Sequence, residues 1–188
     1  LIAYHADIHE YFDSYFVYVS QLYDLILADD YSGMLRYMNH NYNVKYFFIG
    51  LDHKYLVSPT NDRDVDISFV GRMDRPGRGD LCSFLQKEGF SVVVYGPGTK
   101  NGYISTEEMR ELYGRSKIVI NLTSSTINMP FYSHPRSINS RITQLKYRIW
   151  EGMCSGALVF TEPGFGLSNI GKDGEDFIVF NSYEDIAS

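Results

Sequence analysis

The sequence predicts an α/β fold, a doubly wound parallel sheet that is Rossmann-like in layout and is preceded by part of a second α/β domain. From Val65 onward, five short apolar runs alternate with helical or loop segments, an order typical of parallel sheets covered by helices. A polar, proline-containing stretch at 58–64 separates these runs from an earlier strand, helix and strand. We therefore expect the end of an N-terminal domain over 1–57, a linker over 58–64 and the Rossmann-like domain over 65–188.

The first 57 residues are expected to hold three strands and a helix. Apolar runs typical of strands occupy residues 1–4, 23–28 and 44–50. Asp29 or Asp30 is placed to cap a helix over 32–41, because aspartate favours that position. Residues 11–19 are aromatic and show no period, which predicts irregular structure. The chain opens inside an apolar run and without a methionine, so we expect a fragment that was cut within a domain.

The second part is expected to alternate strands with helices. Its strand-like apolar runs lie at 65–71, 91–96, 117–122, 157–160 and 176–180. Helices are predicted over 80–88 and 105–115, from Gln144 up to Gly156, and from Ser182. Ser105 and Glu108 have the spacing of a capping box. Gly89 and Gly156 are placed to end helices in the left-handed conformation, which glycine adopts at low cost.

The loops that follow the strands are the candidate site, because ligands of such sheets bind beyond the carboxyl ends of the strands. These loops lie at 71–79, 96–104, 123–143 and 162–174. In the first of them, backbone N–H groups at the start of a helix and the side chains of Arg72, Arg75 and Arg78 suit an anion such as a phosphate. The loop lacks the Gly-Lys-Ser/Thr of a Walker loop, and a merely solvated basic loop remains the alternative.

Composition excludes several classes of function. A net charge of −6 and a pI near 5.3 argue against a nucleic-acid partner, since such domains usually carry a basic balance. The two cysteines, Cys82 and Cys154, lie in apolar helical patterns and predict reduced core residues of a cytoplasmic protein. No apolar run approaches the roughly 18–20 residues that cross a bilayer, so no transmembrane segment is expected.

The helix predicted from Gln144 carries charges that the core does not explain. Arg148 and Glu151 are three residues apart and share a helix face, whereas Lys146 and Arg148 diverge. On spacing alone, a surface Arg–Glu pair worth a few tenths of a kcal/mol remains the alternative to a ligand site.

The segment from Gln144 to Glu162 resembles a pattern of the group 1 glycosyltransferases of the two-domain GT-B type. It reads Gln-x-Lys-x-Arg-x-aromatic-Glu, then Cys-Ser-Gly-Ala, an apolar run and Thr-Glu, and it is most similar to the subgroup related to spore-maturation glycosyltransferases. The resemblance implies that Glu151 holds the ribose of a nucleotide-sugar donor. Better-known members carry another acid eight residues earlier, where this chain has Thr143, so that role does not transfer.

The segment Phe-Val-Gly-Arg, ending at Arg72, resembles the place where the same family receives the donor diphosphate. The resemblance implies that the chain is part of an enzyme that transfers a sugar from a nucleoside-diphosphate sugar to an unknown acceptor. The residues expected to stabilise the negative charge that grows on the leaving diphosphate are Arg72, Lys146 and Arg148. The residues expected to bind the donor are Gly71, Arg78, Gly98, Glu151 and Glu162. No cofactor and no metal ion are expected.

Two other classes stay open, because a fold does not fix a function. One is a non-catalytic module that binds a nucleotide or phosphate, and the other is a flavodoxin-like receiver or sugar-phosphate enzyme. His5 and His9 are four residues apart, as metal ligands on a helix can be, but nothing else in the sequence supports a metal site. For His134, in a predicted loop, a solvent-exposed histidine is the favoured interpretation and contact with a ligand is the alternative. Asn121-Leu-Thr123 matches the glycosylation pattern by chance, at the end of a buried strand.

Overall fold

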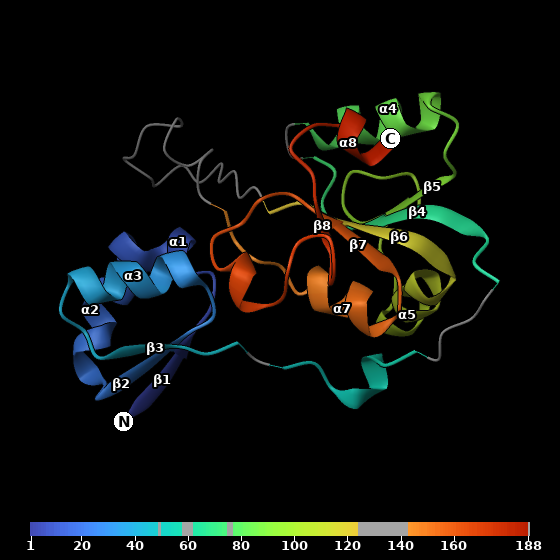
Figure 1. The fold of residues 1–188 in the computed structure, drawn as a ribbon. Coiled ribbons are helices and arrows are strands. Elements are labelled where there is room, and N and C mark those ends of the chain that lie inside the picture. Colours follow the sequence, from blue (N-terminus) through green and yellow to red (C-terminus); the bar gives the residue numbers. More distant parts are fainter. Residues whose placement is uncertain (49, 58–61, 75–76, 124–142, 188) are drawn as a thin grey trace. The chain divides into compact units, whose positions relative to one another are not determined.

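The computed structural model describes residues 1–48, 50–57, 62–74, 77–123 and 143–187 (Figure 1). Contacts divide the described chain into two compact units. The first holds residues of 1–50, 143–145 and 164–167, and the second holds residues of 51–123, 146–163 and 168–187. Four residues of the expected linker at 58–64 lie outside the described residues, and the domain boundary at that place stays a prediction.

The first unit contains a parallel sheet of three strands in the order β1-β2-β3. The strands are β1 (Ile2–His5), β2 (Leu25–Ala28) and β3 (Val44–Tyr46), with Ile2 opposite Leu25 and Ile26 opposite Val44. All three predicted strands are present, although β3 ends before residue 50. Helix α3 (Tyr31–Asn39) is capped by Asp30, one of the two predicted capping residues, whose carboxylate accepts a hydrogen bond from the Gly33 N–H at 2.5 Å.

The segment from residue 8 to residue 22 is helical, so the prediction of irregular structure over 11–19 was wrong. It consists of α1 (Ile8–Tyr11), a π-helical turn (Phe12–Phe16), α2 (Val17–Val19) and a 3₁₀ turn (Ser20–Leu22). Ile8 and Phe12 are fully buried, and Phe16 packs against the same core. These three side chains follow a four-residue period that exposed tyrosines between them had obscured. Tertiary packing decides the helix here.

The second unit contains the expected doubly wound parallel sheet, with five strands in the order β5-β4-β6-β7-β8. The strands are β4 (Val65–Val70), β5 (Val92–Tyr95), β6 (Ser116–Asn121), β7 (Leu158–Thr161) and β8 (Ile178–Val179). The chain runs from β4 to the edge strand β5 and then crosses back to β6. Strand order therefore reverses at β4 and β6, the place where such sheets bind ligands.

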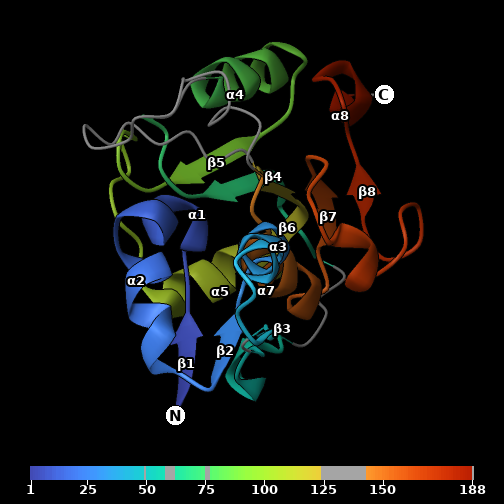
Figure 2. The ribbon, with the colours of Figure 1, turned by 90° about the vertical axis from the view of Figure 1, so that its left-hand side faces the viewer.

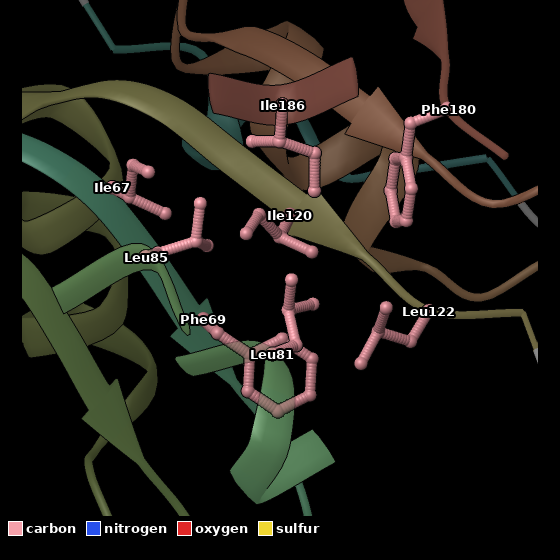
Figure 3. Close-up of a cluster of buried hydrophobic side chains, with 8 residues drawn as sticks. All are labelled: Ile67, Phe69, Leu81, Leu85, Ile120, Leu122, Phe180 and Ile186. Atoms are coloured by element: carbon pink, nitrogen blue, oxygen red, sulfur yellow. The ribbon is translucent and has the colours of Figure 1, made fainter. Parts of the chain in front are cut away.

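Helices cover both faces of this sheet (Figures 1 and 2). The helices are α4 (Arg78–Lys87) and α8 (Glu184–Ala187) on one face, and α5 (Thr106–Arg115) and α7 (Arg148–Cys154) on the other. Figure 3 shows the core of the first face, where Leu81 and Leu85 of α4 meet Phe69 and Ile120 of the sheet. On the other face, Tyr113 of α5 is buried with residues of the sheet. Both faces of the sheet are therefore apolar.

The predicted helices are present as α4, which begins two residues before the predicted Asp80, and as α5, whereas the predicted start of α7 was wrong. Ser105 and Glu108 form both hydrogen bonds of the capping box, and Gly89 and Gly156 adopt positive φ angles of 94° and 69°. Helix α7 begins at Arg148, four residues later than predicted. Leu145 and Ile149 are both buried, but Leu145 is assigned to the first unit and Ile149 to the second, so their helical spacing linked residues of two units.

Among the described residues, no helix has the length and the apolar character that crossing a membrane requires.

Candidate functional site

The loops after β4 and β5 pack backbone against backbone at the carboxyl edge of the second sheet. The Gly71 N–H donates to the Tyr95 carbonyl at 2.8 Å, and the Met73 N–H donates to the Pro97 carbonyl at 2.8 Å. Gly96 has a φ of 125°, and a Cβ at that position would lie 2.3 Å from the Gly71 carbonyl oxygen. Only glycine permits this approach. Two of the four candidate loops therefore form one rigid pair.

Gly98, predicted to line the donor site, belongs to this loop pair. It has a φ of 85°, and a Cβ there would lie 3.0 Å from the Asp74 nitrogen. The loop after β5 thus lies against the residues that follow Arg72, as expected from the parallel sheet.

Arg72 lies at the surface, directly after the turn that ends β4. Its side chain is 57% exposed, and its Nε donates to Asp74 Oδ1 at 3.0 Å while its Nη2 donates to Asp74 Oδ2. The hydrogen bond with Asp74 raises the pKa of Arg72. An exposed pair of this kind is screened by water and exchanges readily. The Arg72 fork is therefore accessible to a competing anion.

Arg78 is the first residue of α4 and is 5% exposed. Its Nη1 donates to the Arg72 carbonyl at 2.7 Å, and its guanidinium carbon lies 5.5 Å from the centre of the Phe69 ring. The structure thus brings Arg72 and Arg78 together, and Arg78 supports the main chain of Arg72. Arg75 lies outside the described residues.

Arg148 is directed into the sheet edge. Its Nε donates to the Val70 carbonyl at 2.7 Å, and its Nη1 donates to Asn121 Oδ1 at 3.4 Å. The guanidinium carbon lies 4.5 Å above the Phe69 ring. Glu151 follows one turn later on α7 and is half-buried. Burial raises the pKa of the Glu151 carboxyl, while the charge of Arg148 lowers it.

Glu162 ties the ends of β6 and β7 together. Its Oε2 accepts a hydrogen bond from the Thr123 N–H at 2.8 Å, and the Thr123 hydroxyl donates to the Pro163 carbonyl at 2.7 Å. The carboxylate of Glu162 is therefore held by the main chain of Thr123, which follows β6. Lys146 lies half-buried, two residues before α7.

Asn121 and Thr161 belong to this edge as well, and sequence reasoning gave them no functional role. Asn121 Nδ2 donates to the Thr161 hydroxyl at 2.8 Å, and both side chains are buried. The signal in the sequence was a polar residue at the carboxyl end of each of two apolar strands.

Of the histidines singled out in the sequence, His5 belongs to the first unit. His5 is buried in the first unit with its Nδ1 2.6 Å from the Tyr37 hydroxyl oxygen. Burial lowers the pKa of His5 and raises the pKa of Tyr37 to about 12. His134 lies outside the described residues. Within the described ranges, no group of three or more histidine, cysteine or acidic side chains is arranged to hold a metal ion.

The sequence of residues 78–188 matches the model of a family described as glycosyl transferase-like. This match covers more than half of the chain and most of the second unit. The chain belongs to this glycosyl transferase-like family. The resemblance to glycosyltransferases is thereby confirmed, and the place in the spore-maturation subgroup stays a prediction. No curated protein matches the chain significantly.

Several solved structures have a similar fold. Anabaena Alr3699/HepE, in complex with UDP and glucose, matches 90% of this chain with a TM-score of 0.63 and 12% identity. TarM matches 93% with a TM-score of 0.64 and 15% identity. The pneumococcal O-GlcNAc transferase GtfA, in complex with UDP and GlcNAc, matches 92% with a TM-score of 0.59 and 12% identity. The chain spans 53%, 37% and 38% of these proteins, respectively. At such identities the likeness shows the fold alone.

Proposed function

We propose that this chain is part of a GT-B glycosyltransferase that transfers a sugar from a nucleoside-diphosphate sugar to an acceptor, and that the second unit binds the donor. The observation that carries the proposal is the family match over 78–188, which includes α4, α7 and the ends of β6 and β7. The donor is a substrate, and the proposal includes no metal ion or cofactor.

The diphosphate is proposed to bind at the loop after β4. Arg72 supplies an accessible guanidinium there, and the N-terminus of α4 supplies a partial positive charge. Negative charge grows on the departing diphosphate in the transition state, so cations fixed at that place lower the barrier. Arg78 holds the main chain of this loop, and Lys146 is proposed as a second cation for the leaving group.

The ribose is proposed to bind at Glu151, whose carboxylate accepts hydrogen bonds from sugar hydroxyl groups. Gly71 makes room for Arg148, and Gly98 makes room for the main chain of Asp74, so both glycines fix the loops that are proposed to hold the donor. Glu162 holds Thr123, which follows β6. The HepE and GtfA structures contain UDP, which makes UDP the first nucleotide to test.

We place the protein in the cytoplasm as part of this proposal. Cys82 and Cys154 are free thiols, and both are half-buried. Reduced cysteines of this kind are usual in that compartment.

Calorimetric titration of the 188-residue chain with UDP, GDP and ADP tests the donor site. Each titration is compared with the matching monophosphate and with inorganic phosphate. We expect one nucleoside diphosphate to bind more tightly than its monophosphate and than phosphate. If inorganic phosphate binds as tightly as the nucleoside diphosphate, the site is a basic loop that binds any phosphate. If no nucleotide binds, the proposal is contradicted.

A UDP-sugar then separates transfer from plain binding. If the chain binds UDP and the full-length protein neither transfers nor hydrolyses any UDP-sugar, the alternative of a non-catalytic nucleotide-binding module is favoured.

A further inference from the structure

One side chain, that of Arg148, joins the carboxyl ends of neighbouring strands. Val70 and Asn121, which accept its hydrogen bonds at 2.7 and 3.4 Å, are the last residues of β4 and β6. Asn121 in turn donates to Thr161, the last residue of β7, at 2.8 Å. Arg148 itself is the first residue of α7. A single hydrogen-bonded chain therefore fixes the start of α7 to three adjacent strands at the proposed donor edge.

The turn at Gly71 leaves room for the guanidinium of Arg148. A Cβ at Gly71 would lie 2.5 Å from Arg148 Nη2 and 3.0 Å from the Phe69 ring. The φ angle of Gly71 lies outside the left-handed region, so the glycine provides space here rather than backbone freedom. The guanidinium also lies 4.5 Å above the Phe69 ring, where a cation is attracted to the ring face. We call this space beside Gly71, which the Arg148 guanidinium fills, the slot, and Arg72 is the next residue in the chain.

Arg148 and Arg72 therefore differ in what their forks contact. The N–H groups of the Arg72 guanidinium contact the exposed carboxylate of Asp74, and an incoming anion can take the place of that carboxylate. Two donor atoms of Arg148 point at a buried edge of the sheet, on a carbonyl and an amide oxygen. A lysine has no planar fork and cannot make both bonds from this position.

We propose that Arg148 is a positioning residue of the donor site, which sets the place of the Arg72 loop and of Glu151 without gripping the diphosphate. The inference rests on the proposed function and deepens it. The positive charge of Arg148 interacts with Glu151 on the same helix. It also interacts with the buried Tyr113 hydroxyl of α5. Arg148 lowers the pKa of Glu151 against the effect of burial, which favours the ionised carboxylate that binds a ribose.

Hydrogen exchange of the ligand-free chain tests the positioning directly. The variants are Arg148→Lys, which keeps the charge and loses the fork, and Gly71→Ala, which keeps every charge and fills the slot. We expect the Gly71 and Met73 amides, bound to Tyr95 and Pro97, to exchange about tenfold faster in both, the effect of about one lost hydrogen bond. The Leu81 amide in α4 should not change. Wild-type exchange at Gly71 and Met73 in both variants would overturn the inference.

UDP binding supplies the second test. Arg148→Lys and Gly71→Ala should each raise the dissociation constant for UDP by about tenfold and leave its salt dependence unchanged. The double variant should be no weaker than the worse single variant, because both act on one contact. In Arg148→Gln, the loss of UDP affinity on acidification should begin at higher pH, since the pKa of Glu151 rises.

Other outcomes are informative in distinct ways. A salt dependence that flattens in Arg148→Gln as it does in Arg72→Ala would assign Arg148 to the diphosphate and overturn the inference. If UDP affinity in Arg148→Gln falls on acidification at the same pH as in the wild type, Arg148 does not affect the pKa of Glu151, and the coupling to Glu151 is overturned. Failure of the wild type to bind any nucleotide would instead remove the proposed function, while the exchange result would still stand.

Discussion

Glu151 has surroundings unlike those of an ordinary surface glutamate. It lies half-buried on α7, and burial raises its carboxyl pKa while Arg148 lowers it. A carboxylate held in such a place gains by accepting hydrogen bonds from a ligand, because the ligand replaces the water it has lost.

Replacement of Glu151 by glutamine should therefore weaken UDP binding by about 1–3 kcal/mol, the usual effect of a charge-assisted hydrogen bond. The measurement is the dissociation constant by calorimetry. Glu111→Gln, on the exposed side of α5, is the matched control and should bind UDP like the wild type. An unchanged dissociation constant for UDP in a folded Glu151→Gln variant would mean that Glu151 only pairs with Arg148 and does not bind the donor.

The same residue predicts a pH dependence of stability. A carboxyl whose pKa is raised by folding binds its proton more tightly in the folded chain, so its contribution to stability is lost as the pH rises through the folded pKa. Glu151→Gln should therefore gain stability over the wild type at about pH 7 and lose that gain towards about pH 4.5, near the ordinary pKa of glutamate. Urea unfolding at both pH values measures the difference. A gain of equal size at both values would contradict the raised pKa.

Among the elements, α7 depends on a close approach to the sheet. A Cβ at Gly152 would lie 2.8 Å from Val159 Cγ2 and 3.2 Å from Val119 Cβ. Valine side chains are stiff and cannot move aside easily. The helix that carries Arg148 and Glu151 is therefore placed by a residue without a side chain.

The variant Gly152→Ala should destabilise the chain by about 1–3 kcal/mol through overpacking. Gly79→Ala is the control, because it also adds a methyl group within a helix but meets no atom within 4 Å. That change should be neutral or stabilising by up to about 1 kcal/mol. Chemical unfolding measures both, and equal effects of the two variants would refute the packing argument.

The sequence predicted the elements best where the signal is local. The strands of the second unit are short and mostly apolar, and the left-handed glycines at 89 and 156 mark helix ends by their own conformational freedom. The helical turns at Ile8 and Phe12 were missed, because their burial depends on a sheet formed later in the chain. The start of α7 was misplaced, because the apolar spacing continued across Leu145, which is assigned to another unit than Ile149.

The site shows the same limit. The parallel order of the strands was enough to bring Gly71, Arg72 and Gly98 to one edge. The contact of Arg148 with Val70 spans 78 residues of sequence, and no local pattern predicts it. Spacing alone therefore left Arg148 open as a surface or a ligand-binding residue, and the three-dimensional structure shows its partners.

At the scale of the whole molecule, the chain spans about half of Anabaena HepE. The proposed reaction needs a donor site and an acceptor site, whereas the residues proposed to bind the donor all belong to the second unit. We therefore expect the 188-residue chain to bind UDP and to transfer sugar from a UDP-sugar slowly or not at all. Release of UDP from the donor, followed with and without candidate acceptors, checks this. Rapid turnover by the 188 residues alone would contradict it.

The central claim is that the diphosphate binds at Arg72, and the salt dependence of UDP binding tests it most directly. Arg115→Ala is the matched control for Arg72→Ala, because Arg115 is 58% exposed and its Nε donates to Asp64 at 2.8 Å, much as Arg72 contacts Asp74. UDP dissociation constants at low and high salt should show a flatter dependence in Arg72→Ala than in the wild type, since salt screens the lost charge pair. Arg115→Ala should keep the wild-type dependence. Equal slopes in all three proteins would mean that Arg72 is a solvated loop residue and that the diphosphate binds elsewhere.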